Sequence, residues 1–472
     1  MRFALALRLL RAEGPRALVE RWRDRRLDAR RARRFAVSAG DGESGARAAA
    51  GTVAAEARSP TLWVLPFPLQ RRSGGAAIQL LVRLEERATA LPVAVVQRLP
   101  GRLRCELWGR GVARPLAREW AVASESSPLL DPSPLPILLA AAAWVGARRV
   151  HFESLVDLPL ALPLAVQAHG LEIGLSAHDF ALFCPRPHLI EEPEARFCGF
   201  STDPQRCSRC LATRWALPEG YQEARREAAG RLAAAASVLE FPSEFMRREH
   251  LRLFPGISPE LTRVLPPRSL AQPLALPLRP VRRPPQRIAL AGAVHRHKGA
   301  REFEAVVQEL AARRPGEFEW HVFGGGDPRR PEACRQRAGA VVAVNCGSRQ
   351  PPEPLQRCRI AAAEDVPFEL AGSASGELLD DGLELARSLV PVHRAGSLPA
   401  RLRAARIDLA LLPSIWPEAH CLVLDECALA GVPVVAFDLG ALGERVRAGD
   451  LGVLVDPRTG APGLAAAIAD LR

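Results

Sequence analysis

The chain has 472 residues and a formal net charge of +12, and this length predicts two or three domains with a large core. We expect no transmembrane helix, because the apolar run at residues 137–145 is far shorter than the roughly 20 residues that such a helix needs. No small-residue cleavage site follows residues 1–10, so we predict no signal peptide. The ten cysteines are irregularly spaced, which favours a reducing cytosol over a disulfide scaffold.

Residues 1–60 are predicted to form a basic, helical N-terminal extension, since Arg outnumbers acidic residues there two to one. Residues 16–34 have the composition of a basic helix, and residues 1–34 therefore suit an anionic membrane surface. A solvated arm is the alternative. Nucleic-acid binding is disfavoured, because the basic residues have no aromatic interleaving and match no known module.

Residues 61–267 are predicted to form a Rossmann-like domain, in which apolar strands alternate with helices around a parallel sheet. Gly74 and Gly75 lie between its first strand and the following helix, where glycines allow either close approach of a ligand or a tight turn. His178 directly follows the apolar run 171–177, at the ligand edge of such a sheet; a purely structural histidine is the alternative. The expected strands cover residues 61–66, 93–96, 103–107, 149–152, 171–177, 238–241 and 262–265.

A cysteine-rich segment at residues 184–210 lies within this domain. It carries Cys184, Cys198, Cys207 and Cys210, of which the last two form a C-x-x-C pair. Four thiolates can hold a structural zinc ion. The first two gaps are irregular and His188 is a competing ligand, so free thiols remain the alternative.

Residues 268–286 are rich in Pro and Arg and are predicted to be a linker to a second Rossmann-like domain at 287–472. Its first strand, 287–291, is followed by Gly292 and Lys298 and then by a helix at 301–312. Lys298 is the only lysine among 64 basic residues, which favours a position that requires a compact ammonium group. At a strand-to-helix turn, that group and the helix N–H groups suit a diphosphate.

Residues 328–366 have no periodicity and are predicted to be an irregular insertion. Beyond them, residues 407–412 read as a buried strand, followed by a loop with Glu418 and a helix that starts near His420 and contains Glu426. The amides of Cys421 and Leu422 would face a phosphate at this helix start. The two glutamates suit sugar and ribose hydroxyls, although exposed glutamates on a helix are common.

These residues resemble the group 1 family of retaining, nucleotide-sugar-dependent glycosyltransferases, which have the GT-B fold of two Rossmann-like domains with parallel sheets facing a cleft. The resemblance spans about residues 61–460 and is most specific at the C-terminal motifs. It is carried by the loop 413–418, the spacing from Glu418 to Glu426, Ala-Gly-Val-Pro-Val-Val at 430–435, Lys298-Gly299, His178-Asp179, Gly74-Gly75 and Pro-Ser-Glu-Phe at 242–245.

The resemblance implies a role for each of these residues. Glu418 would orient the donor sugar and His178 would line the sugar site. Lys298 would bind the diphosphate and Glu426 the ribose, with Gly292, Cys421, Leu422, Gly74 and Gly75 close to the donor. Transfer would retain the anomeric configuration and require no metal. The chain departs from the family at Ala293, where an arginine is usual; His295 or Arg296 would substitute for it.

The resemblance predicts a cytoplasmic enzyme, peripheral on the inner face of the cell membrane, that transfers a sugar from a nucleotide-sugar donor to a glycan or lipid-linked acceptor during cell-surface polysaccharide synthesis. Two other hypotheses remain open. A non-catalytic scaffold subunit of a glycan assembly complex is consistent with Ala293 and the insertion. The presence of Glu418, Glu426, His178 and Lys298 together argues against it. A sugar-nucleotide epimerase fits the architecture, but the glutamate pair makes it less favoured.

Overall fold

The computed structural model divides the chain into two compact units, one of Met1–Leu69, Leu80–Glu153 and Ala161–Gly174 and the other of Gln70–Gln79, Ser154–Leu160 and Leu175–Arg472. Gly74, Gly75, Ala293 and His295 fall outside the described residues, as do the extension 1–59 and the linker 268–286, so the predictions for them stay predictions. The structure describes residues 60–66, 93–99, 102–108, 116–122, 129, 134–267, 287–292, 296–323, 332–335, 341–344, 357–359, 367–370 and 398–471.

The N-terminal sheet has the strand order β10-β9-β6-β5-β1-β2-β3-β4. β1 pairs in parallel with both β2 and β5, as predicted, and its apolar residues are buried. The strands are β1 Thr61–Leu65, β2 Val93–Leu99, β3 Arg102–Trp108, β4 Leu116–Ala121, β5 Arg149–Phe152, β6 Glu172–Ser176, β9 Val238–Phe241 and β10 Thr262–Val264.

The predicted parallel sheet is confirmed, and β3 and β4 extend it with strands that run antiparallel to their neighbours. Only two residues separate the end of β2 from the start of β3. A connection this short can form a hairpin but cannot cross over to a parallel strand. β4 was not predicted at all, because its residues are mostly exposed and show no apolar alternation.

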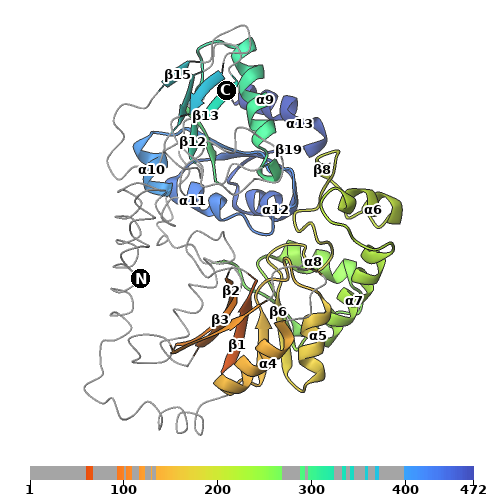
Figure 1. Cartoon of the computed structure of the whole chain (residues 1–472). Helices are drawn as coiled ribbons and strands as arrows, with labels where there is room; N and C mark the ends of the chain where they lie inside the picture. Colours follow the sequence, from red (N-terminus) through yellow and green to blue (C-terminus); the bar gives the residue numbers. More distant parts are fainter. Residues whose placement is uncertain are drawn as a thin grey trace, which may run out of the picture. The chain divides into compact units, whose positions relative to one another are not determined.

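The described α-helices of the N-terminal half range from 8 residues in α5 to 15 in α7. Helices α4 and α5 pack against each other (Figure 1), and α4 buries Leu138, Ala141 and Ala142. Among the helices that the structure describes, none combines the length and apolar character that a membrane span requires. These elements are α4 Pro134–Val145, α5 Ala161–Ala168, α6 Pro204–Ala212, α7 Tyr221–Ala235, α8 Glu244–Leu253 and the 3-10 turn η1 Pro259–Leu261, with the small hairpin β7 Ile190–Glu191 and β8 Arg196–Phe197.

The C-terminal sheet has the order β15-β14-β12-β11-β17-β18-β19, and all neighbours except β14 and β15 are parallel. Successive residues of its strands face opposite sides. Thus Ile288 and Leu290 join the core under α9, while Ala289 and Ala291 join the core under α10 and α11. The strands are β11 Arg287–Ala291, β12 Glu319–Phe323, β14 Val341–Val344, β15 Arg357–Arg359, β17 Leu409–Leu412, β18 Val434–Phe437 and β19 Gly452–Val455.

The helices of this half flank the same sheet, and α9 and α13 lie side by side (Figure 1). Strands β17 and β18 and helix α11 confirm the predicted strand–loop–helix–strand unit. The remaining elements are η2 Arg296–Lys298, α9 Ala300–Arg313, α10 Leu398–Ala404, α11 Leu422–Ala430, α12 Gly440–Gly449, η4 Pro457–Thr459, α13 Gly460–Asp470 and the small pair β13 Glu332–Arg335 and β16 Pro367–Leu370.

The prediction that residues 328–366 lack regular structure is wrong for the three short strands β13, β14 and β15. Val341–Val344 pairs in parallel with β12 and so extends the main sheet. This short run is apolar and mostly β-branched, a composition that suits a strand. The surrounding Arg, Gln and Pro residues obscured that signal.

Candidate functional site

Lys298 and Glu418 bind each other at the carboxyl end of the C-terminal sheet. Lys298 ends the η2 turn after β11, and Glu418 lies in the loop after β17. The Lys298 Nζ atom is 2.7 Å from each carboxylate oxygen of Glu418. Ser414 donates a further hydrogen bond to the same carboxylate. Glu418 is buried, and a carboxylate is stable there because it has these charged and polar partners.

An aromatic group borders this ion pair. The Lys298 Nζ atom lies 5.4 Å from the centre of the Trp416 ring, within the range of a cation–π interaction. His297 stacks on His188 at 3.8 Å between ring centres, and both histidines meet Trp416 edge-on. The sequence suggested His188 only as a competing metal ligand. Its contact with His297 joins positions too far apart in the chain for a pattern to reveal.

Two glycines allow the backbones around the ion pair to approach closely. Gly299 has a φ of 82°, and a Cβ atom there would lie 1.8 Å from the Pro413 carbonyl oxygen. Gly440 has a φ of 66°, and its Cβ atom would lie 2.6 Å from the Glu418 nitrogen. A backbone hydrogen bond also connects the Glu418 loop to the start of α12, since Ala441 N–H donates to the Glu418 carbonyl oxygen at 2.9 Å. Neither Gly299 nor Gly440 has room for a side chain.

The start of α11 forms a second part of the site. The helix begins at Leu422, two residues later than the predicted start, and Cys421 precedes it with a left-handed φ of 72° and no side-chain cap. Gly292, with a φ of 107°, lies so close that a Cβ atom would be 3.1 Å from the Val423 side chain. The uncapped N–H groups of a helix start suit an anion such as a phosphate. Glu426 lies in the second turn and is half-buried.

Sequence reasoning missed a charged network that fixes this helix start. Arg445 of α12 donates to the carbonyl oxygens of His420 and Cys421 at 2.8 and 3.2 Å, and also binds Asp425. The His420 Nε2 atom lies 3.2 Å from Asp425. Burial raises the pKa of the Asp425 carboxyl, but the hydrogen bond with His420 and the charge of Arg445 outweigh it and hold that pKa below its usual value. No sequence pattern pairs Arg445 with residues 20 or more positions away.

Ser243 connects α8 to the loop that carries Glu418. Its hydroxyl caps the start of α8 by accepting a hydrogen bond from Met246 N–H at 3.2 Å, and it donates one to the Ala419 carbonyl oxygen at 2.6 Å. We expect Ser243→Ala to lower the free energy of unfolding by about 1–2 kcal/mol, because it removes a helix cap and leaves a buried carbonyl without its donor. Urea unfolding of the purified variant measures this change.

The matched control is Ser258→Ala, since Ser258 precedes the η1 turn but makes no side-chain cap. Its effect should stay within about 0.5 kcal/mol. Equal effects of the two substitutions would show that the Ser243 hydroxyl does not anchor the loop.

His178 follows β6 at the carboxyl end of that strand and is half-buried. The neighbouring Asp179 accepts a hydrogen bond from Ala181 N–H at 2.8 Å, and burial raises its pKa to about 6. Arg296, considered as a substitute for the family arginine, binds Glu192 at 3.3 Å. The structure thus brings together Lys298, Glu418, Gly292, Cys421 and Leu422, and the roles assigned to these residues and to His178 stay predictions.

The cysteine-rich segment encloses a cavity of its own. Cys184, Cys198, Cys207 and Cys210 are free thiols that line this cavity together. Burial raises the pKa of Cys184 to about 12 and also raises the pKa values of Cys198 and Cys210. In the described ranges, no three His, Cys, Asp or Glu side chains already surround a common metal position. The zinc ion stays a prediction.

Comparison with known proteins adds a family match in the C-terminal half. Residues 355–472 match the family described as glycosyl transferases group 1, whereas a search of curated proteins finds no match. This matched region contains Glu418, Glu426, Cys421 and Leu422, but not Lys298.

Several solved structures overlap with most of the chain. A sucrose-phosphate synthase from Thermosynechococcus elongatus has 15% identity and a TM-score of 0.48, covering 88% of this chain and 90% of that one. HepE of Anabaena, in complex with UDP, has 14% identity and a TM-score of 0.47, covering 87% and 89%. A glycosyltransferase from Rickettsia africae has 12% identity and a TM-score of 0.43, covering 88% of each. The family match itself covers residues 355–472.

Proposed function

We propose that this protein transfers a sugar from a nucleotide-sugar donor to an acceptor hydroxyl, because residues 355–472 match the group 1 glycosyl transferases. The observation that carries the proposal is the contact between Lys298 and the buried Glu418, at 2.7 Å, beside the uncapped start of α11. An ammonium, a carboxylate and free helix amides supply the three kinds of group that a sugar diphosphate requires: a cation, an acceptor for sugar hydroxyls and an anion site.

Donor binding is proposed to separate Lys298 from Glu418, so that each side chain binds a different part of the ligand. The diphosphate takes the place of Glu418 at the ammonium group of Lys298, and its remaining charge faces the amides of Cys421 and Leu422. The released carboxylate of Glu418 accepts hydrogen bonds from sugar hydroxyls, while Glu426 in the second turn binds the ribose. The Lys298 charge is then paired with the diphosphate, and the buried carboxylate of Glu418 is stabilised by the sugar hydroxyls and by the hydrogen bond from Ser414.

The proposed reaction retains the anomeric configuration. The bond between the anomeric carbon and the phosphate oxygen breaks, and the acceptor oxygen bonds to the same face. The acceptor proton passes to the departing diphosphate. Positive charge from Lys298 and from the α11 start stabilises the leaving group, so no metal is required. His178 is proposed to line the sugar site.

The acceptor is proposed to be a glycan or a lipid-linked saccharide used in cell-surface polysaccharide synthesis, on the cytoplasmic face of the membrane. Support comes from the basic residues 1–34, which suit an anionic lipid surface. The non-catalytic scaffold is the alternative that a ligand-binding experiment can separate from this proposal.

We expect one nucleotide sugar from a panel of UDP-, GDP- and ADP-sugars to raise the Tm of the purified protein by several degrees. A ligand at 100 times its Kd stabilises the folded state by about 2.7 kcal/mol. Differential scanning fluorimetry measures the shift, and release of the nucleotide in the presence of a saccharide acceptor then measures transfer.

Lys298→Met is the matched control, since it keeps the packing of the aliphatic stem but removes the charge that binds the diphosphate. We expect this variant to lose the shift. An unchanged Tm of the native protein with every member of the panel would contradict the proposal and favour the scaffold.

A further inference from the structure

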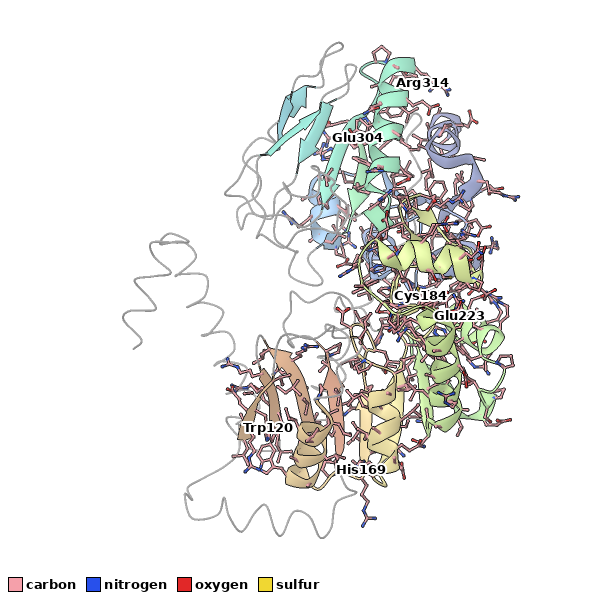
Figure 2. All side chains as sticks on the ribbon, turned by 45° about the vertical axis from the view of Figure 1, so that its right-hand side comes forward. Trp120, His169, Cys184, Glu223, Glu304 and Arg314 are labelled. Carbon is pink, nitrogen blue, oxygen red and sulfur yellow. The ribbon has the colours of Figure 1, made fainter. Side chains whose placement is uncertain are left out.

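The four cysteines of residues 184–210 come from three separate segments. Cys184 follows β6 by eight residues, Cys198 follows β8, and Cys207 and Cys210 lie one turn apart on α6. Figure 2 shows Cys184 in the region of α6 and α7. All four cysteines line the same cavity. Four sulfurs around one cavity are the donor set of a closed structural metal site.

Hydrogen-bond donors already reach two of these sulfurs. Glu192 N–H donates to the Cys210 sulfur at 3.3 Å, and the Arg226 guanidinium donates to the Cys207 sulfur at 3.4 Å.

A neutral thiol is only a weak acceptor, whereas a charged acceptor forms hydrogen bonds of roughly twice the strength. These donors therefore match thiolates bound to a metal, whose ligands are usually held by such outer hydrogen bonds.

The charge of the cavity wall gives an independent indication. Arg186, Arg206 and Arg226 line it together with one carboxylate, that of Glu191. Arg226 reaches the Cys207 sulfur at 3.4 Å, and Arg206 binds Glu191. The wall thus carries an excess of two positive charges. Four thiolates around a divalent cation carry two negative charges, which this wall would neutralise, whereas four neutral thiols would leave the excess uncompensated.

We propose that Cys184, Cys198, Cys207 and Cys210 together bind one Zn²⁺ ion as a structural site. Tetrahedral coordination by four sulfurs favours zinc, with an iron site as the other metal of this geometry. Since the sulfurs do not yet surround a common point, binding draws them in to about 2.3 Å from the metal. Each thiol releases its proton to solvent as its sulfur binds, so the step exchanges protons for the ion without any redox change.

The proposed ion would also support the Lys298 turn. The segment between Cys184 and Cys198 carries His188, which stacks on His297 at 3.8 Å, and Glu192, which binds Arg296 at 3.3 Å. His297 and Arg296 belong to the same η2 turn as Lys298. Metal loss is therefore expected to loosen one wall of the candidate site, although the metal takes no part in the reaction.

Metal analysis of the purified, untagged protein tests the proposal. We expect one zinc per chain by plasma mass spectrometry after gel filtration, and its complete release by a mercurial reagent in the presence of a chromogenic zinc indicator. The double variant Cys207→Ser/Cys210→Ser should contain no zinc. The matched control Cys105→Ser, at a buried thiol of β3 outside this segment, should retain it.

Cobalt substitution keeps the test decisive if the double variant fails to fold. Native protein produced with Co²⁺ should show the sulfur-to-metal charge-transfer absorption of tetrahedral thiolate coordination. Iron in place of zinc, two disulfides by mass spectrometry of the non-reduced protein, or four thiols that titrate freely in metal-free native protein would each overturn the proposal. None of these readouts depends on sugar transfer, so the site and the proposed function can fail separately.

Discussion

Glu418→Gln is expected to lower the kcat of sugar transfer by about 10²–10³-fold, the usual effect of removing one group that stabilises charge in a transition state. The amide keeps the size of the carboxylate and one oxygen acceptor, but loses the charge that pairs with Lys298 at 2.7 Å. Steady-state kinetics with the donor identified by the ligand panel measures the effect. Its stability cost should be about 1.5–3 kcal/mol, the value of a hydrogen bond to a charged group, so the variant remains folded.

Two further variants separate the chemistry from the packing. Glu319→Gln removes another carboxylate of the same sheet, which pairs with Arg287 at the amino end of β12, and should leave transfer intact. Lys298→Met/Glu418→Gln removes both charges, so it should be more stable than Lys298→Met alone, in which the buried carboxylate has lost its cation. The double variant should still be inactive. Full transfer by Glu418→Gln would refute the assignment of this residue.

Gly299→Ala is expected to destabilise the protein by about 2–5 kcal/mol, the sum of a left-handed backbone penalty and an overpacking penalty. Its Cβ atom would lie 1.8 Å from the carbonyl oxygen of Pro413, a backbone atom that no side-chain rotation can move. Relief of this clash must separate the Lys298 turn from the loop that leads to Glu418. Transfer should therefore fall together with stability, as measured by urea unfolding and by kcat.

Gly316→Ala provides the control for Gly299→Ala. Gly316 has nearly the same φ, 83° against 82°, but an added Cβ atom there would meet nothing within 4 Å. It should cost only the left-handed penalty of about 1–2 kcal/mol and leave kcat unchanged. If both alanine variants lose the same stability and keep their activity, the close approach at Pro413 has no functional importance.

The sequence predicted best where local signals agree. The strand before Pro413 and the helix that ends at Gly431 are bounded by residues with fixed backbone preferences, and both are present in the structure. The exposed strand β4 and the short strand β14 lacked such signals. A strand without apolar alternation forms because it pairs with adjacent strands, and a single sequence does not reveal which strands are adjacent.

The site was predictable by residue type but not by contact. The sequence assigned Lys298 to a diphosphate and Glu418 to a sugar, and did not indicate that these two side chains bind each other across 120 positions. The interactions of Arg445 with Asp425 and with the His420 carbonyl were missed for the same reason. Long-range pairs between charged residues depend on how the elements pack, and in a chain with 64 basic residues the number of possible partners is large.

The single lysine of this protein, Lys298, lies in the candidate site, so a label on its amine would report on that site. Lys298 is 31% exposed, and the α-amino group is the only other primary amine of the chain. Reductive methylation with ¹³C-formaldehyde keeps the ammonium charge and would add one resolved side-chain methyl signal to the NMR spectrum. A protease specific for lysine has one cleavage site, after the same residue. Spectroscopy and limited digestion can therefore follow occupancy of the Lys298 ammonium directly, without a substitution and without knowledge of the acceptor.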